Sequence, residues 1–99
     1  MIAVNKEAGE KLQIKWMVLH FSDLKAADRN GILKLIMLEG IDIGIICNRE
    51  AMKTKEHYNC TIQGRDYYGN IIAVGRDTET ERIRSLTAKE LRFIMEQMK

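Results

Sequence analysis

The residues that could support catalysis or bind a metal are few in this chain. It contains two histidines, His20 and His57, and two cysteines, Cys47 and Cys60. His57 and Cys60 are three residues apart in a segment with strand character, so they would project from opposite faces of a strand. A closed zinc site needs four ligands, and the sequence offers no obvious fourth. We therefore expect no metal, no cofactor and two reduced cysteines in the core.

Sequence motifs of known catalytic sites are also missing. The chain has no Gly-x-Ser-x-Gly nucleophile motif and no His-Glu-x-x-His zinc motif. Residues 64–70 have the glycine spacing of a phosphate-binding loop, but Asn70 and Ile71 stand where a lysine and a hydroxyl residue are required. No histidine and carboxylate form an evident acid–base pair. The sequence predicts that the chain is not an enzyme.

Two adjacent tyrosines indicate binding instead. Tyr67 and Tyr68 lie between Arg65-Asp66 and Gly69-Asn70, which predicts that they occupy the tip of a β-hairpin. The turn itself does not need tyrosines, and exposed tyrosines are common at interfaces. Arginines on the following strands would extend this arginine–tyrosine surface. Its expected contact residues are Arg65, Tyr67, Tyr68, Asn70, Arg76, Arg82 and Arg84.

Two classes of ligand fit such a surface, and a purely structural explanation competes with both. The tyrosines could pack against a protein while the arginines bind its carboxylates, as in a regulator or inhibitor of a protein partner. The same side chains could stack on the bases and bind the phosphates of a nucleic acid or nucleotide. Alternatively, a tyrosine folds onto the sheet, while Arg82 and Arg84 pair with Glu79 and Glu81. We favour protein binding as the function and keep nucleic-acid or nucleotide binding as its alternative.

These residues must be positioned by one small domain. The chain has 99 residues, of which 45% are hydrophobic and 30% charged, and a net charge of +2, all ordinary for a globular domain. We expect a single domain over residues 1–99, with residues 1–10 as a loosely ordered lead-in. Met1–Glu10 lacks a signal-peptide pattern and no segment has the length of a membrane span. The expected protein is therefore cytoplasmic, without membrane contact, and a homodimer, since so small a domain gains from self-association.

Alternation of apolar and polar residues predicts several strands. Lys11–Phe21 begins with such alternation, which places Leu12, Ile14, Trp16 and Val18 on one apolar face. Asn48–Glu56 is polar and predicts a loop that could contain a helical turn. The other expected elements are strands at Ile41–Cys47, His57–Gly64, Asn70–Arg76 and Thr80–Arg84, and a turn at Arg65–Gly69.

Residues 23–38 are open to two interpretations. Ser22-Asp23 could cap a helix, and five apolar or small residues follow at helical spacing. Asn30-Gly31 is a strong hairpin signal, so the alternative is a turn there followed by a strand at Ile32–Leu38. We favour the helix. The residues at helical spacing are Leu24, Ala27, Gly31, Leu35 and Leu38.

A C-terminal helix is better defined. Thr87-Ala88-Lys89-Glu90 forms a capping box, and Leu86 and Leu91 form the matching hydrophobic staple. Leu91, Ile94, Met95 and Met98 follow as an apolar stripe. The expected order is β-α-β-β-β-β-α, which is an α+β fold with a small antiparallel sheet and one or two helices packed on it.

The order strand, turn, strand, helix from His57 onward resembles a double-stranded-RNA-binding domain. In that family the last helix opens with a basic cluster that binds phosphate, whereas this chain has the acidic Thr78-Glu79-Thr80-Glu81 at the corresponding place. The resemblance therefore implies neither a function nor site residues here. Residues 41–85 could also close as a small SH3-like or Sm-like barrel.

Overall fold

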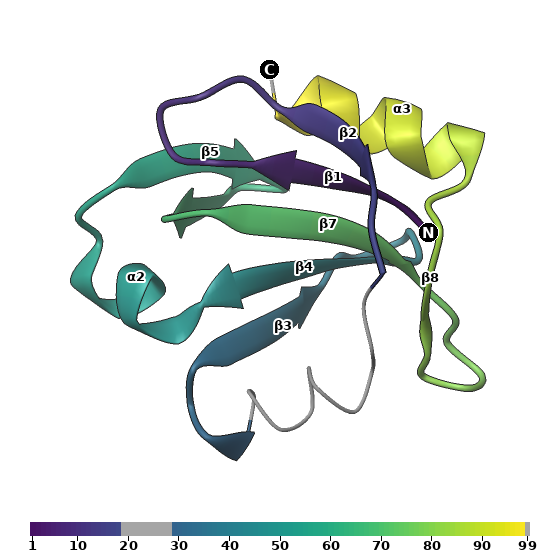
Figure 1. Cartoon of the computed structure of the whole chain (residues 1–99), viewed down its shortest axis with the longest axis horizontal. Coiled ribbons are helices and arrows are strands. Elements are labelled where there is room, and N and C mark those ends of the chain that lie inside the picture. The colour runs from purple at the N-terminus through teal and green to yellow at the C-terminus, as the bar shows by residue number, and fades with distance from the viewer. Residues whose placement is uncertain (19–28, 99) are drawn as a thin grey trace.

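The structure, a computed structural model, describes residues 1–18 and 29–98 (Figure 1). Within this part, an antiparallel sheet has the order β2–β1–β7–β4–β3, and β8 also pairs with β7. Two further strands, β5 and β6, form a separate ribbon. The bounds are β1 Ile2–Lys6, β2 Gln13–Trp16, β3 Leu33–Met37, β4 Ile43–Asn48, α2 Arg49–Thr54, β5 Tyr58–Ile62, β6 Arg65–Tyr68, β7 Ile71–Arg76, β8 Ile83–Arg84 and α3 Ala88–Gln97. The expected α+β class with an antiparallel sheet is confirmed, with more strands than the sequence indicated.

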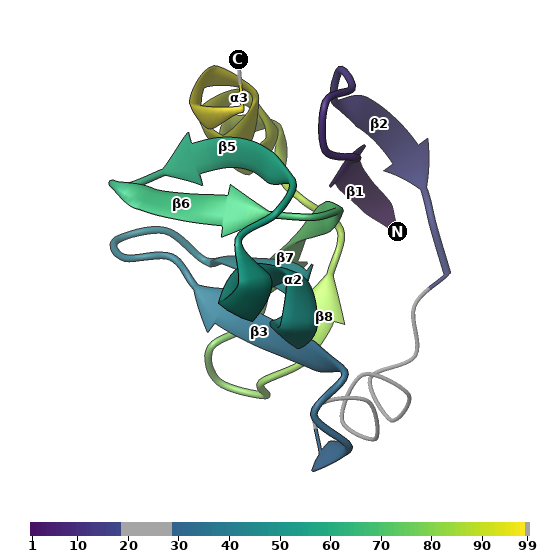
Figure 2. The ribbon, with the colours of Figure 1, turned by 90° about the vertical axis from the view of Figure 1, so that its left-hand side faces the viewer.

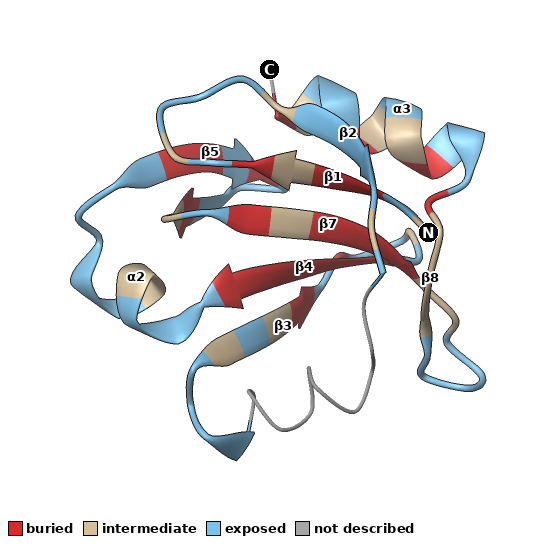
Figure 3. Cartoon of the chain, viewed as in Figure 1, coloured by how far each residue is buried: buried red, intermediate tan, exposed pale blue. Residues whose placement is uncertain are grey.

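The two central strands are apolar on both faces, which is why they lie in the middle of the sheet. β4 and β7 pair over five residues, from Ile43 opposite Gly75 to Cys47 opposite Ile71. One face of the sheet packs against the β5–β6 ribbon and α3 to form the main core, while a smaller cluster lies on the other face (Figure 3). β2 and β3 are left as the two outer strands of the sheet (Figure 2).

The C-terminal helix has the cap that its sequence predicts. The Thr87 hydroxyl accepts from the backbone N–H of Glu90, and the Glu90 carboxylate accepts from the backbone N–H of Thr87. Ile94 and Met98 are buried in the main core, with Leu91 half-buried beside them. Met95, which we placed on the same stripe, is 36% exposed.

The first residues are not a loosely ordered lead-in. β1 lies between β2 and β7, and Ala3 and Val4 are fully buried. Val4 pairs with Ile14 of β2 and with Ala73 of β7. The sequence prediction failed because MIAVN is too short for a periodic pattern to show, whereas two-sided strand pairing holds it in place.

The favoured helix over residues 23–38 is wrong from residue 30 onward. Leu33–Met37 is strand β3, which pairs with β4 from Leu33 opposite Asn48 to Met37 opposite Gly44. Gly31 has a φ of +74°, a left-handed value that suits glycine at a turn. The alternative of a turn followed by a strand is therefore correct for residues 30–37. The expected cap at Ser22-Asp23 and residues 24–27 lie outside the described residues.

The expected hairpin turn at Arg65–Gly69 is also wrong. The turn is one strand earlier, at Gln63 and Gly64, whose φ angles of 51° and 78° are the paired positive values of a two-residue β-hairpin turn. Arg65–Tyr68 consequently forms β6, with Tyr67 opposite Cys60. This displacement of the turn decides where the two tyrosines point.

Candidate interaction surface

Tyr67 lies in the core, so its predicted place on the contact surface is wrong. Its side chain is 0% exposed and packs in the main core with Cys60 and Ile62. Its hydroxyl has no hydrogen-bond partner among the described residues. Burial raises the pKa of the Tyr67 phenol to about 12. A side chain in this position contributes to stability and not to recognition.

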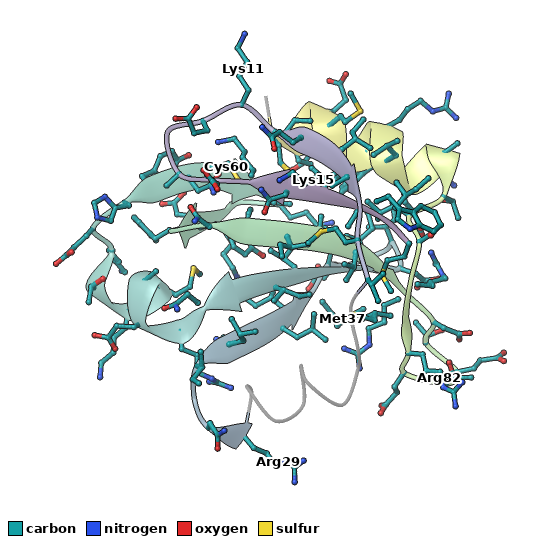
Figure 4. The ribbon with its side chains drawn as sticks, in the orientation of Figure 1. Lys11, Lys15, Arg29, Met37, Cys60 and Arg82 are labelled. Carbon is teal, nitrogen blue, oxygen red and sulfur yellow. The ribbon has the colours of Figure 1, made fainter. Side chains whose placement is uncertain are left out.

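The rest of the arginine–tyrosine surface is divided between two ends of β7. Arg65 is exposed and Tyr68 half-buried, and Tyr68 packs edge-to-face against Tyr58 with ring centroids 5.9 Å apart. Asn70 is exposed just before β7, where its side-chain oxygen accepts from the backbone N–H of Ala8 at 3.0 Å. The other three predicted residues follow at the far end of β7 and beyond it, and Arg82 lies beside β8 on the opposite side of the molecule from β5 (Figure 4). They are Arg76, Arg82 and Arg84.

Arg84 is committed to a structural ion pair rather than to a free surface. Its guanidinium donates to both carboxylate oxygens of Glu90, at 2.7 and 2.9 Å. The side chain of Glu90 is only 8% exposed. The sequence suggested pairing with Glu79 or Glu81, but the helix that follows β8 brings Glu90 closer. Of the predicted contact residues, Tyr67 is therefore buried in the core and Arg84 is engaged with Glu90.

A buried asparagine that the sequence did not single out holds the ribbon to the sheet. The Asn59 side-chain amide donates to the backbone oxygens of Lys6, at 2.8 Å, and Gly69, at 2.7 Å. Lys6 in turn donates from its ammonium to the backbone oxygen of Asn59 at 3.3 Å. Asn59 lies at the bulge in β5, between Tyr58 and Cys60, which turns its side chain inward. Strict alternation predicted an outward position for it.

The two most exposed large apolar side chains of the described residues, Trp16 and Val18, lie on β2 and directly after it. Trp16 is 75% exposed, Val18 74% and Ile14 50%. We call these three residues the β2 stripe. The sequence correctly placed Ile14 and Trp16 on one apolar face of a strand, and the structure leaves that face exposed, with Val18 following the end of β2. Ile14 and Trp16 are opposite Val4 and Ile2 of β1, and no described element covers that outer position.

The backbone N–H and C=O groups of β2 that no described strand pairs belong to Ile14 and Trp16, two residues of the β2 stripe. Met17 and Met1 exchange two backbone hydrogen bonds of 2.8 Å, so the peptide groups of Met17 point toward β1. In an antiparallel ladder the bonded residues alternate, so the N–H and C=O groups of Ile14 and Trp16 point away from β1. Among the described residues, no strand pairs with these outward groups, so β2 presents open donors, open acceptors and apolar side chains from the same two residues.

The buried thiols, the potential metal ligands and one small pocket are the remaining features of the described residues that bear on chemistry. They contain no group of three potential metal ligands, and none of their helices is long and apolar enough to cross a membrane. Cys47 and Cys60 are buried free thiols whose pKa values are raised by burial. A polar pocket of about 100 Å³ lies at the β1–β2 turn, smaller than a typical small-molecule site. It is lined by Asn5, Glu7, Glu10, Lys11 and Gln13.

Comparison of the chain with protein-family models, curated proteins and solved structures finds no match.

Proposed function

We propose that this chain is a non-catalytic protein-binding module of the cytoplasm, which regulates or inhibits a protein partner and contacts it through the edge of β2. The observation that supports this is the coincidence, in Ile14 and Trp16, of outward backbone groups with exposed apolar side chains. Proteins normally protect such an edge because it pairs readily with another strand. Here the edge carries the chain's single tryptophan, a residue type enriched at binding hot spots.

The mechanism is the addition of an extended segment of the partner to the sheet. The segment's backbone bonds to the free N–H and C=O groups of Ile14 and Trp16, while its alternate side chains pack on the β2 stripe. Gln13 and Lys15 project from the other face of β2, opposite Asn5 and Ala3. Lys15 is exposed there, so a segment with a carboxylate on that face is favoured.

Affinity capture from an extract of the source organism tests this proposal with the wild-type chain and three variants. Trp16→Ala removes apolar contact area, and Ile14→Pro removes one outward N–H, a change that an edge strand tolerates. Met37→Ala is the control, because Met37 is an exposed apolar residue on the opposite outer strand, β3. We expect a protein captured by the wild type and by Met37→Ala, and lost with the other two. Equal capture by all four chains would overturn the proposal.

Nucleic-acid or nucleotide binding, the alternative from the sequence, relied on one continuous arginine–tyrosine surface. The burial of Tyr67 in the core and the pairing of Arg84 with Glu90 take two of its contact residues away. An oligonucleotide titration provides the contrast. Binding at about 50 mM salt that weakens steeply with added salt, and that is unchanged by Trp16→Ala, would replace the protein-binding proposal.

A further inference from the structure

We infer that β2 pairs two copies of this chain in an antiparallel arrangement, with a two-fold axis passing between the two Trp16 residues. This inference rests on the proposed function, because it assigns an occupant to the same edge when the partner is absent. The partner's strand and the second copy would then compete for one set of backbone groups.

The β2 stripe is symmetric about Trp16. Ile14 and Val18 are both β-branched and lie two residues to either side of it. A two-fold axis at Trp16 places Ile14 of each copy opposite Val18 of the other, so the exposed side chains of the two stripes cover one another. The outward N–H and C=O of Trp16 then exchange two hydrogen bonds with those of its counterpart, as an antiparallel bonded pair requires.

Repulsion between the two copies of Lys15 disfavours a register shifted by one residue, with the axis at Lys15. If Ile14 of one copy lay opposite Trp16 of the other, the axis would fall on Lys15 and set two ammonium groups opposite each other, which is destabilising. With the axis at Trp16, Lys15 lies opposite Met17 instead. An axis at Ile14 would avoid the two lysines but would place Val18, which is 74% exposed, opposite Glu10. Only the Trp16 register pairs all three stripe residues.

The contact is limited to a short strand segment, so the dimer is weak and reversible. A stable interface buries about 800 Å² on each partner, more than a few residues of one edge strand provide. We expect a dissociation constant in roughly the micromolar to millimolar range, typical of small interfaces. At high concentration the chain would mask its own binding edge, and dilution or a tighter partner strand would expose it.

Trp16 reports directly on this contact because the chain has no other tryptophan. Sedimentation equilibrium should show a monomer–dimer equilibrium, and dilution should shift the tryptophan emission toward longer wavelength as Trp16 becomes exposed. Ile14→Pro should remain monomeric with the long-wavelength spectrum, while Met37→Ala should behave as the wild type. A wild-type chain that is monomeric at millimolar concentration, or an Ile14→Pro chain that still dimerises, would overturn the inference.

Cysteine cross-linking tests the register without removing Trp16. Chains carrying Ile14→Cys and chains carrying Val18→Cys should form a disulfide heterodimer when mixed under mild oxidation, because the two positions face each other across the axis. Each variant alone should form little cross-linked product, and the native cysteines do not interfere because both are buried. Efficient cross-linking of Ile14→Cys with itself would overturn the placement of the axis.

Failure of this inference is distinguishable from failure of the proposed function. A monomeric chain whose captured partner is still lost with Trp16→Ala would exclude the dimer and leave strand addition intact. A dimer of the stated register whose captured partner is indifferent to Trp16→Ala would support the pairing and overturn the proposed function.

Discussion

Two hydrogen bonds join the guanidinium of Arg84 to the carboxylate of Glu90, with Nη1 2.7 Å from Oε1 and Nη2 2.9 Å from Oε2. Oε1 also accepts from the backbone N–H of Thr87 at 2.9 Å. One carboxylate therefore closes the cap of α3 and ties that helix to β8. The bond from Arg84 is the main reason that the pKa of Glu90 lies below its ordinary value.

Glu90→Gln should destabilise the fold, because it removes the charge from both contacts. We expect a loss of about 1–3 kcal/mol at neutral pH, typical of charged hydrogen bonds. Since the folded-state pKa is lowered, the Glu90 contribution is complete above the ordinary carboxyl pKa and is lost as pH falls through the lowered value. Urea unfolding of both chains at pH 7 and at pH 2 measures this. A stability difference equally large at both pH values would contradict the assignment.

Gly75→Ala should destabilise the junction of β7 and β8. Gly75 is opposite Arg84 in the strand register, and a Cβ there would collide with the Arg84 guanidinium and lie 2.6 Å from the backbone oxygen of Ser85. The cost should be about 1–3 kcal/mol, as for other overpacked sites. It should be smaller when measured in an Arg84→Ala background, because one of the two obstructing groups is then absent. Identical costs in the two backgrounds would show that the guanidinium is not an obstacle.

Tyr67→Phe should fold at least as stably as the wild type, because the buried hydroxyl that it removes has no partner among the described residues. Tyr67→Ala, by contrast, should lose about 3–5 kcal/mol through the cavity that it leaves. The raised phenol pKa of about 12 means that the wild type loses stability relative to Tyr67→Phe as pH rises above about 10 toward that value. Thermal unfolding at pH 8 and pH 11 compares the two chains. A destabilised Tyr67→Phe would reveal a hydrogen bond at the hydroxyl.

Asn59→Ala should be among the most damaging polar substitutions. It leaves the buried backbone oxygen of Lys6 and the part-buried backbone oxygen of Gly69 without the amide that now donates to each. Two lost hydrogen bonds with unsatisfied acceptors should cost about 2–4 kcal/mol. Asn70→Ala is the matched control, because Asn70 accepts one bond at the exposed surface. Equal losses in chemical denaturation would show that Asn59 does not hold the ribbon.

Trp16→Ala should leave the free energy of unfolding within about 0.5 kcal/mol of the wild type, as for most exposed positions. The side chain is 75% exposed, and Ile2, the residue opposite it in the described strands, is 37% exposed. Chemical denaturation followed by circular dichroism makes the comparison, because the variant has no tryptophan fluorescence. A loss comparable to that of Asn59→Ala would make Trp16 a structural residue.

The sequence predicted an element correctly where interactions between residues close in the sequence determine its structure. The capping box at Thr87 and Glu90 satisfies helix N–H groups with side chains three residues apart, so no tertiary information is needed to find it. The isoleucine-rich alternation of β4 likewise indicates a buried strand, and Ile43, Ile45 and Cys47 are buried as expected.

Predictions failed where contacts with residues distant in the sequence determine the structure of a segment. Leu35 fits a helical spacing, yet its segment pairs with β4 because that strand offers a free edge. Tyr67 was assigned to a turn on the strength of Gly69-Asn70, while the true hairpin turn is Gln63-Gly64. Ile14 and Trp16 show the strand pattern clearly, but alternation alone does not say whether an apolar face is covered by another element.

The place of β1 in the sheet sets a constraint on synthesis. β1 is synthesised well before one of its neighbours, β7, whose residues are 71–76. Until those residues emerge, the hairpin of β1 and β2 has no core to pack on, and an isolated hairpin is marginal in water. From the synthesis of β2 until β7 emerges, nascent chains therefore expose the β2 stripe while neighbouring chains on one polysome are close together. Contacts of such long sequence separation also slow folding after release.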